Sequence, residues 1–256
     1  MLQSLGWAAV GTGFTFLMTT LGAAMVFFLS GEPKPHFQKV VLGFAAGVMT
    51  AASVWSLLIP AIEQTASTGV HFSWLPAAVG MLVGVGFLAM MDELLPRLRR
   101  EIMKQSSRQS ALLMTAITLH NIPEGMAVGL AFALAASREG VAAAAALALG
   151  IGIQNFPEGA AIALPLRQEG CSRRRAFLSG MLSGSVEPVF GVLVVLIAAV
   201  AQPVMPWLLS FSAGAMLYVV VEELIPEASE GEHSNLGTIF FSIGFTLMMV
   251  LDVALG

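Results

Sequence analysis

Charged side chains are scarce in this sequence. Asp, Glu, Lys and Arg make up 11% of its 256 residues, and hydrophobic residues make up 57%. An ordinary soluble domain has roughly 25% charged residues, so this composition excludes a soluble protein and predicts an integral membrane protein. Cysteine is almost absent as well: Cys171 is the only one, and a single thiol cannot form an internal disulfide.

Apolar segments cover nearly the whole chain. Runs of about 18 or more mostly apolar residues are long enough to cross a bilayer as helices. Eight such segments are predicted, near residues 5–29, 40–63, 72–95, 111–136, 141–166, 176–201, 203–228 and 237–255. We therefore expect an all-α, polytopic membrane protein with one integral domain over residues 1–256. The first segment has neither a basic flank nor a small-residue cleavage site, so we expect a retained helix and not a signal peptide.

Basic residues are confined almost entirely to alternate connections between these segments. Eleven of the twelve lie between segments one and two, three and four, or five and six: Lys34, Lys39, Arg97, Arg99, Arg100, Lys104, Arg108, Arg167, Arg173, Arg174 and Arg175. The opposite side has only Arg138. Cytoplasmic loops of membrane proteins carry an excess of Lys and Arg. These connections are therefore predicted to be cytoplasmic, with both termini outside.

The fourth and fifth segments each contain the polar pattern N-x-P-E-G, once in HNIPEG and once in QNFPEG. His120 and Glu124 are four residues apart, as are Gln154 and Glu158, so each pair shares one face of its helix. The prolines of the two motifs remove backbone donors, which bends each helix and frees a carbonyl. Such a break is tolerated at membrane depth where the helix lines a cavity or faces protein.

The two motif glutamates need a partner at membrane depth. Asn121 or Gln154 alone would fit a role in hydrogen bonding between helices. A carboxylate near the bilayer centre, in contrast, costs on the order of 3 kcal/mol or more. The central parts of segments four to six contain no Lys or Arg, so a bound cation is the predicted counterion.

The motif pair also indicates an inverted internal repeat. Segments four and five must run in opposite directions, and a second match links FAAGVM from Phe44 in segment two with FSAGAM from Phe211 in segment seven. The expected plan relates segments one to three to segments six to eight, and segment four to segment five. Inverted repeats are typical of secondary transporters that bind their substrate near the midplane.

Further candidate ligands lie in two other segments. Glu187 is about half-way along the sixth segment, and Met49 is near the middle of the second. With the motif side chains they form a nitrogen, oxygen and sulfur donor set that suits Zn²⁺ better than Mg²⁺ or Ca²⁺. Met49 taken alone fits core packing better than metal binding. Three carboxylates exceed the charge of one divalent ion, so either Glu124 and Glu158 bridge a second ion or one acid holds a proton.

These features resemble the ZIP (Zrt/Irt-like) family of divalent metal transporters, and most closely its bacterial GufA-like branch. The resemblance rests on HNIPEG, QNFPEG, the SVEP sequence around Glu187, Met49, and eight spans with both ends outside. It implies import of Zn²⁺, or of Cd²⁺, Fe²⁺, Mn²⁺ or Co²⁺, into the cytoplasm, and no enzymatic activity. It also implies a homodimer in the bacterial inner membrane, in which helices one, four, five and six move against the other four. The implied partners are metal ions, the lipid bilayer and a second copy, with no nucleic acid.

The resemblance further implies two metal sites. The matching residues are Met49, His120, Glu124, Gln154 and Glu158 for the first, and Asn121, Glu124, Asn155, Glu158 and Glu187 for the second. Two positions depart from the family pattern: many relatives have histidine at the position of Gln154, and some have an acid at the position of Asn155. The loop between segments three and four lacks the histidines that relatives often carry, so its basic residues are expected to contact lipid headgroups.

An acidic stretch at the end of the seventh segment is a candidate for receiving the ion on the cytoplasmic side. Its residues are Glu222, Glu223, Glu227 and His233. For the neighbouring Glu230 and Glu232, a solvated loop is an equally good interpretation. Asp92, Glu93 and Asp252 receive no role from the sequence.

Two other functions fit parts of the sequence. An intramembrane metalloenzyme would need an open metal position with an activated water, but the chain has no H-E-x-x-H and a single central histidine. A proton-coupled carrier of an organic solute would need side chains matched to that solute, whereas the groups found are metal-type donors. Loss of bound Zn²⁺ on mutation of Glu158 would argue against the solute carrier, and transport into liposomes would argue against the enzyme.

Overall fold

The computed structural model describes residues 2–28, 35–69, 72–102, 108–135, 138–168, 170–200, 202–231 and 234–255. Within these ranges the side chains of 95–120 are not among those described, so the side chain of His120 lies outside the described part. The same holds for Glu232 and His233, and for seven of the basic residues used to predict the topology: Lys34, Arg97, Arg99, Arg100, Lys104, Arg108 and Arg138.

Helices account for almost all of the described chain, and no strand occurs in it. The helices are α1 (Leu2–Ala24), α2 (Pro35–Ala52), α3 (Ile59–Ser67), α4 (Trp74–Ile102), α5 (Arg108–Leu134), α6 (Arg138–Gln168), α7 (Arg173–Gly184), α8 (Val186–Val200), α9 (Met205–Val219), α10 (Ile225–Ser229) and α11 (Leu236–Leu255). Short 3₁₀ turns η1 (Met25–Phe27) and η4 (Gln202–Val204) and two π-helical segments, η2 (Ser53–Leu58) and η5 (Val220–Leu224), connect some of them.

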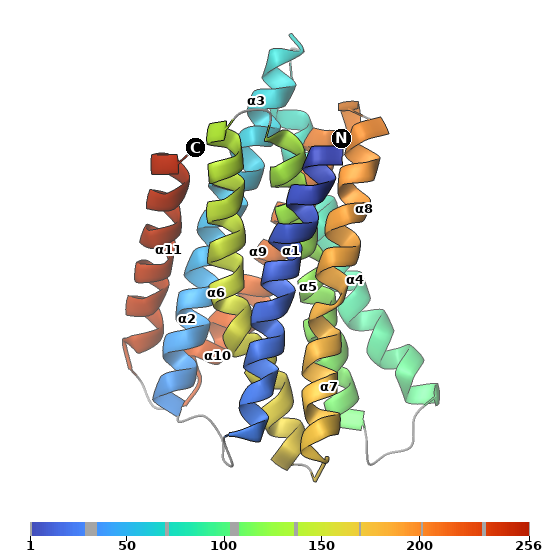
Figure 1. Ribbon diagram of the computed structural model, residues 1–256, viewed down its shortest axis with the longest axis vertical. Helices are drawn as coiled ribbons and strands as arrows, with labels where there is room; N and C mark the ends of the chain where they lie inside the picture. The colour runs from blue at the N-terminus through green and yellow to red at the C-terminus, as the bar shows by residue number, and fades with distance from the viewer. Residues whose placement is uncertain are drawn as a thin grey trace.

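Seven helical spans in the described residues are long and apolar enough to cross a membrane. Two of them combine α2 with α3 and α9 with α10, and one combines α7 with α8. The span that contains α5 has a shorter described apolar stretch, Asn121–Leu134. The prediction of an all-α, polytopic membrane protein is confirmed. Figure 1 shows the helices as one bundle, with both termini at the same end.

Prolines explain where three of these spans depart from regular α-helix. Pro60 and Pro226 each stand in the first turn after a π-helical segment. A proline removes one backbone donor and its ring collides with the carbonyl four residues earlier. A wider π turn before it relieves that collision. Pro188 has a similar effect, because α7 ends at Gly184, four residues before it, and α8 begins at Val186. In contrast, α5 continues through Pro123 without a break in its helical assignment.

The helices pair in the pattern that an inverted repeat requires. In the outer part, α2 packs along α11 and α4 packs along α9; in the central part, α1 packs along α6 and α5 along α8. If segments one to three are exchanged with segments six to eight, and segment four with segment five, the α2–α11 pair becomes the α9–α4 pair. In the same way the α1–α6 pair becomes the α8–α5 pair. Figure 1 shows α11 and α4 at opposite sides of the bundle, as this exchange demands.

Glycines repeat this correspondence at close range. A methyl group added to Gly47 of α2 would meet the backbone carbonyl of Phe241, and one added to Gly214 of α9 would meet that of Met81. These two glycines hold the same place in FAAGVM and FSAGAM. The π-helical segments begin at Ser53 and Val220, each nine residues after the first residue of its motif (53 − 44 and 220 − 211). The predicted inverted repeat is therefore present in the packing as well as in the sequence.

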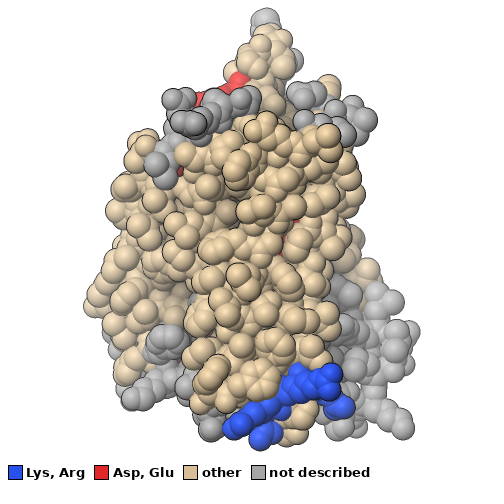
Figure 2. Space-filling view, viewed as in Figure 1, with Lys and Arg blue, Asp and Glu red and all other residues tan. Residues whose placement is uncertain are grey.

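Exposed basic side chains gather at the end of the bundle that lies opposite the termini. Figure 2 shows them at the lower end of the molecule, where α6 ends and α7 begins. The exposed arginines of this region are Arg167, Arg173, Arg174 and Arg175. Among the described residues, the remainder of the visible face carries very few charges, as expected for a surface that contacts lipid.

Candidate metal centre

The two N-x-P-E-G motifs meet inside the central helices. Asn121 and Glu124 of α5, and Gln154 and Asn155 of α6, have no exposed surface. The amide nitrogen of Gln154 donates a hydrogen bond of 2.8 Å to Oε1 of Glu124. The side chains that the sequence placed on two separate helices are thus in direct contact.

Glu187 joins this cluster from α8. Its carboxylate is fully buried, and the amide nitrogen of Asn155 donates to Oε2 over 3.0 Å. The break after α7 places Glu187 in the first turn of α8. A negative charge is favoured near the N-terminus of a helix, which offsets part of the cost of burying this carboxylate.

The cluster concentrates negative charge. Glu158 and Glu187 both act electrostatically on Glu124, and Glu158 also acts on Glu187. Among the described residues, Lys39 near the start of α2 is the only buried basic side chain. Because no Lys or Arg among the described side chains of α5, α6 and α8 lies beside Glu124 and Glu187, these buried acids require another positive charge or a shared proton.

Several polar atoms of the motifs have no hydrogen-bond partner among the described residues. They are both side-chain polar atoms of Asn121, Oε2 of Glu124, Oε1 of Gln154 and Oδ1 of Asn155. Leaving a buried polar group unsatisfied costs about 1–3 kcal/mol, and such groups in a native protein call for an ion or a bound water. Most of these atoms are oxygens, which are suitable donors for a divalent cation.

The two amides adjoining the acids share one arrangement. Gln154 donates through its nitrogen to Glu124, and Asn155 donates through its nitrogen to Glu187. In each case the amide oxygen has no partner in the part of the chain that the structure describes. An amide has both donors and an acceptor, so each side chain can orient a carboxylate with one end and present an oxygen with the other.

The other predicted ligands are Met49, Glu158 and His120. Met49 is fully buried in α2 and belongs to the hydrophobic core, and among the described side chains no hydrogen bond joins it to the acids. Glu158 is half-buried, one turn after Gln154 in α6. Among the described side chains, which exclude His120, no group of three His, Cys, Asp or Glu residues could hold a metal ion alone. The predicted ligand set therefore depends on His120 and on the amides.

The candidate exit residues lie near the end of the bundle opposite the termini. Glu222 and Glu223 are on η5, exposed and half-buried respectively, and Glu227 is exposed on α10. Figure 1 places α10 toward the lower end. Asp92, which the sequence left without a role, accepts a 2.9 Å hydrogen bond from the hydroxyl of Tyr218.

The other acid that the sequence left unassigned is also engaged. Asp252 of α11 accepts a 2.6 Å hydrogen bond from Ser56, which lies in the π-helical segment of the second span. Since Asp252 is close to the C-terminus, this contact lies toward the end of the bundle where the termini are.

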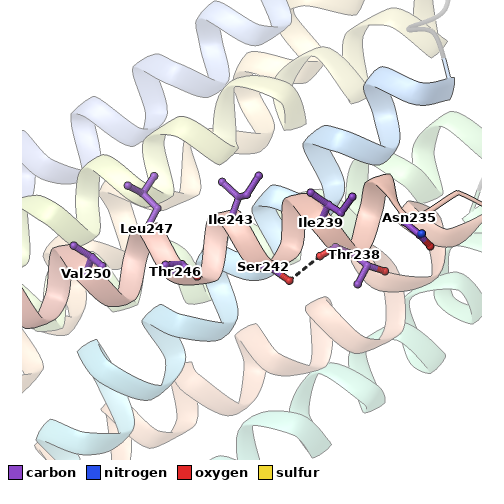
Figure 3. A pocket seen from close by; sticks show the side chains of 8 residues that line it. All are labelled: Asn235, Thr238, Ile239, Ser242, Ile243, Thr246, Leu247 and Val250. Carbon is purple, nitrogen blue, oxygen red and sulfur yellow. Dashed lines mark hydrogen bonds between the residues drawn. The ribbon is translucent and has the colours of Figure 1, made fainter.

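A groove on the surface lies away from the acidic cluster. It follows the outer face of α11 and is lined by Asn235, Thr238, Ile239, Ser242, Ile243, Thr246, Leu247 and Val250 (Figure 3). None of the predicted ligands lines it, and the hydroxyl of Ser242 already donates to the carbonyl of Thr238. Its position on a helix with little buried surface fits contact with lipid and not an ion site.

Comparison with known proteins identifies the family of the chain. A family model described as ZIP Zinc transporter matches residues 98–252, which is more than half of the sequence. The chain belongs to the ZIP family. The matched residues include both N-x-P-E-G motifs and Glu187, so the resemblance inferred from these motifs is confirmed.

Similar proteins of this family cover almost the whole chain. Zinc transporter GufA of Myxococcus xanthus is 39% identical over 93% of this ZIP protein and 94% of its own length. Zinc transporter ZIP11 of Homo sapiens is 37% identical, with 97% of each chain covered. Zinc transporter ZIPB of Bordetella bronchiseptica is 36% identical over 98% of this chain and 82% of its own length.

Sequence reasoning missed one side chain that contacts the cluster. The hydroxyl of Thr19 on α1 donates a 3.2 Å hydrogen bond to Oε1 of Glu187. The available signal was a set of three threonines in an apolar helix, Thr12, Thr15 and Thr19, at spacings of three and four residues. That spacing puts them on one face, but nothing in the sequence of α1 indicates which acid the face meets.

Proposed function

We propose that this ZIP protein carries divalent transition-metal ions, above all Zn²⁺, across the membrane into the cytoplasm. The observation that supports this best is the buried cluster of Glu124 and Glu187 with motif amides whose oxygens have no partner among the described side chains. A cation supplies the positive charge that the acids require, and it gives the amide oxygens a partner in place of a hydrogen-bond donor. The names of the similar zinc transporters agree with this choice of ion.

The proposed ions occupy two neighbouring subsites. The first subsite uses Met49, His120, Glu124, Gln154 and Glu158, and the second uses Asn121, Glu124, Asn155, Glu158 and Glu187. Glu124 and Glu158 contact both ions. Two divalent ions carry four positive charges, which outweigh the three carboxylates and permit neutral amide donors in the remaining positions.

The proposed role of Gln154 and Asn155 follows from their two-ended contacts. Each nitrogen holds a carboxylate at 2.8 or 3.0 Å, which limits the rotation of that carboxylate. Each oxygen then completes the coordination of the bound ion. An amide oxygen is a weaker metal ligand than an imidazole nitrogen or a carboxylate oxygen. The ions are therefore held loosely enough to leave, as a transporter requires.

Movement is proposed to follow the division of the bundle into two groups of helices. The moving group consists of α1, α5, α6, α7 and α8, and the scaffold consists of α2, α3, α4, α9, α10 and α11. Packing within each group is more extensive than packing between them, which supports rigid-body motion of an elevator type. The ion would be exposed alternately to either side while it stays bound to its ligands on α5, α6 and α8, and its contact with Met49 of the scaffold helix α2 would change during the movement.

The orientation, the assembly and the domain organisation complete the proposal. The arginine-rich end opposite the termini would face the cytoplasm, so that both termini lie outside and the acids around Glu222, Glu223, Glu227 and His233 receive the ion. We further propose one transporter domain, a homodimer and a bacterial inner membrane, as the family resemblance implies. No enzymatic reaction is part of this function.

The test is uptake of divalent ions into proteoliposomes that contain the purified full-length protein. We expect saturable uptake of ⁶⁵Zn²⁺, with Cd²⁺, Fe²⁺, Mn²⁺ and Co²⁺ measured in parallel and with a pH gradient present or absent. The control is Ser242→Ala, which changes a hydroxyl on the outer face of α11 far from the motifs. Zn²⁺ uptake no faster than in protein-free vesicles would contradict the proposal.

A competition arm separates the rival functions. Organic solutes added in large excess should leave Zn²⁺ uptake unchanged, because the cluster offers metal donors only. Inhibition by one class of solute, together with its own accumulation in the vesicles, would favour a solute carrier. Uptake lost in Glu158→Ala, while the protein remains inserted, would support the proposed ion path.

A further inference from the structure

Three threonines of α1 form a buried hydroxyl face. Thr12, Thr15 and Thr19 are fully buried. Thr12 donates to the carbonyl of Ala8 over 2.7 Å, and Thr15 donates to that of Thr12 over 3.0 Å. Both hydrogen bonds stay within α1. Hydroxyl groups in membrane helices commonly satisfy themselves in this way, although Thr15 also lies close enough to Glu187 to act on its carboxylate.

Thr19 differs because its hydroxyl reaches another helix. It lies 3.3 Å from the carbonyl of Thr15 and 3.2 Å from Oε1 of Glu187. A hydroxyl has one proton to donate, and hydrogen bonds to a carboxylate are roughly twice as strong as those to a neutral acceptor. The proton of Thr19 is therefore directed at Glu187.

The position of Thr19 is the inverted-repeat counterpart of Glu187. A methyl group added to Gly125, the last residue of the first motif, would meet the backbone carbonyl of Glu187. A methyl group added to Gly159, the last residue of the second motif, would meet the backbone carbonyl of Thr19. Each motif glycine thus lies against the equivalent point of its partner helix. One repeat has a carboxylate there and the other has a hydroxyl, and the two side chains meet.

The result is a carboxylate held from two sides. Oε1 of Glu187 accepts from Thr19 of α1, and Oε2 accepts from Asn155 of α6. Two donors on different helices fix both the position and the plane of the carboxylate. Glu124 has a different environment, because its Oε1 accepts from Gln154 whereas its Oε2 accepts no hydrogen bond from any described side chain.

We propose that Thr19 is a positioning residue that orients Glu187 for the second metal subsite. The inference rests on the proposed function, since it takes Glu187 as a ligand of that subsite. Thr19 itself does not hold the ion; it restricts the carboxylate to the orientation in which Glu187 and the free oxygen of Asn155 face the same ion. Removing a partner that orients a metal ligand typically lowers metal affinity 10- to 100-fold.

The experiment is Zn²⁺ titration of the purified full-length protein, with wild type compared with Thr19→Val, Thr19→Ser and Thr12→Val. Thr19→Val keeps the shape but loses the hydroxyl, and we expect the affinity for the second equivalent of Zn²⁺ to fall about tenfold. Thr19→Ser retains the hydroxyl and should match wild type. Thr12→Val is the matched control, because it removes a hydroxyl from the same buried face that bonds only within α1.

Folding is checked by gel filtration of each variant in detergent. If Thr19→Val does not elute as wild type does, Thr19→Ala provides the same loss of the hydroxyl with a smaller side chain. Equal affinities for wild type and the hydroxyl-free variant would overturn the inference. A single equivalent of Zn²⁺ bound by wild type would overturn it as well, because no second subsite would exist for Thr19 to serve.

A double mutant distinguishes positioning from a general structural role. If Thr19 acts through the carboxylate, Thr19→Val should lower Zn²⁺ uptake in wild type but cause no further loss in a Glu187→Gln background. An equal loss in both backgrounds would overturn the inference. Failure of the proposed function has a separate signature: wild type would then show no Zn²⁺ uptake into vesicles, whatever the titrations of the Thr19 variants show.

Discussion

The outer and central helix pairs use the same packing device for different purposes. In the outer pair of α2 and α11, Gly47 lets the backbone of Phe241 approach closely; in the central pair of α5 and α8, Gly125 does the same for the backbone of Glu187. The outer contact brings together apolar side chains, whereas the central contact brings a carboxylate to the motifs. Close helix packing through glycine is thus a general property of this protein, and function depends on what the approaching backbone carries.

The two copies of the inverted repeat share a backbone plan but differ in one contact at the centre. Both have a π-helical segment before a proline, Pro60 in one copy and Pro226 in the other. They differ where they meet, because one copy supplies Thr19 and the other supplies Glu187. An acid at both positions would place two like charges side by side, which is strongly unfavourable in a buried site. A hydroxyl at one of them instead stabilises the charge of the other.

The largest expected effect comes from removing a motif acid from the central group. Glu124→Ala should reduce Zn²⁺ uptake to the level of empty vesicles, because it deletes a charged ligand proposed to contact both ions. Uptake of ⁶⁵Zn²⁺ into proteoliposomes measures this, with insertion verified by protease protection. Near-normal uptake in Glu124→Ala would rule out the binuclear arrangement.

Separate substitutions in the two subsites should have smaller and different effects. Gln154→Ala should lower the affinity for the first ion about tenfold, since it removes both a neutral ligand and the donor that orients Glu124. Glu187→Gln should leave the first equivalent of Zn²⁺ bound and weaken the second. Calorimetric titration of both variants in one detergent gives stoichiometry and affinity. If Gln154→Ala and Glu187→Gln lose all bound Zn²⁺ to the same extent, the protein has a single shared metal site and not two subsites.

Replacing a glycine at a close helix contact with alanine should distinguish an effect on the free energy of unfolding from an effect on Zn²⁺ binding. Gly47→Ala and Gly125→Ala should each lower the free energy of unfolding by about 1–3 kcal/mol, because the new group overlaps a backbone carbonyl. Gly125→Ala should weaken Zn²⁺ binding more than Gly47→Ala does, since it displaces the charged ligand Glu187, whereas Gly47→Ala can shift only the neutral thioether of Met49. Thermal unfolding and metal titration measure the two effects.

The control for the glycine series is Gly86→Ala on α4, where an added methyl group meets no atom within 4 Å. It should leave stability unchanged or slightly raised, because alanine favours helix. Weaker Zn²⁺ binding in Gly47→Ala, equal to that in Gly125→Ala, would show that the outer and central groups are not functionally distinct.

The smallest effect is expected for a hydroxyl outside the central group. Tyr218→Phe removes the donor to Asp92 and should lower the free energy of unfolding by about 1 kcal/mol, with Zn²⁺ affinity of the motifs unchanged. Unfolding in detergent and metal titration of the same sample test this. A large loss of Zn²⁺ affinity would instead connect Asp92 with the central cluster.

Much of the fold followed from local pattern alone. Apolar length located the helical spans, and the two N-x-P-E-G motifs with FAAGVM and FSAGAM indicated the inverted repeat that the packing of Gly47 and Gly214 confirms. The division of some spans into shorter helices was not predicted, although Pro60, Pro188 and Pro226 are visible in the sequence. Whether a proline causes a break, a π turn or neither depends on its neighbours in space, as the unbroken helix through Pro123 demonstrates.

The sequence by itself determined the class of the protein and the kinds of side chain available for its site, because membrane helices have a required length and buried acids need positive charge. Only the tertiary structure decided which donor orients which acid. Gln154 and Glu124 are 30 residues apart in the chain, Asn155 and Glu187 are 32 apart, and Thr19 and Glu187 are 168 apart. The physical reason is that hydrogen-bond direction and distance between helices depend on how closely their backbones approach, and here glycines such as Gly125 and Gly159 set that approach.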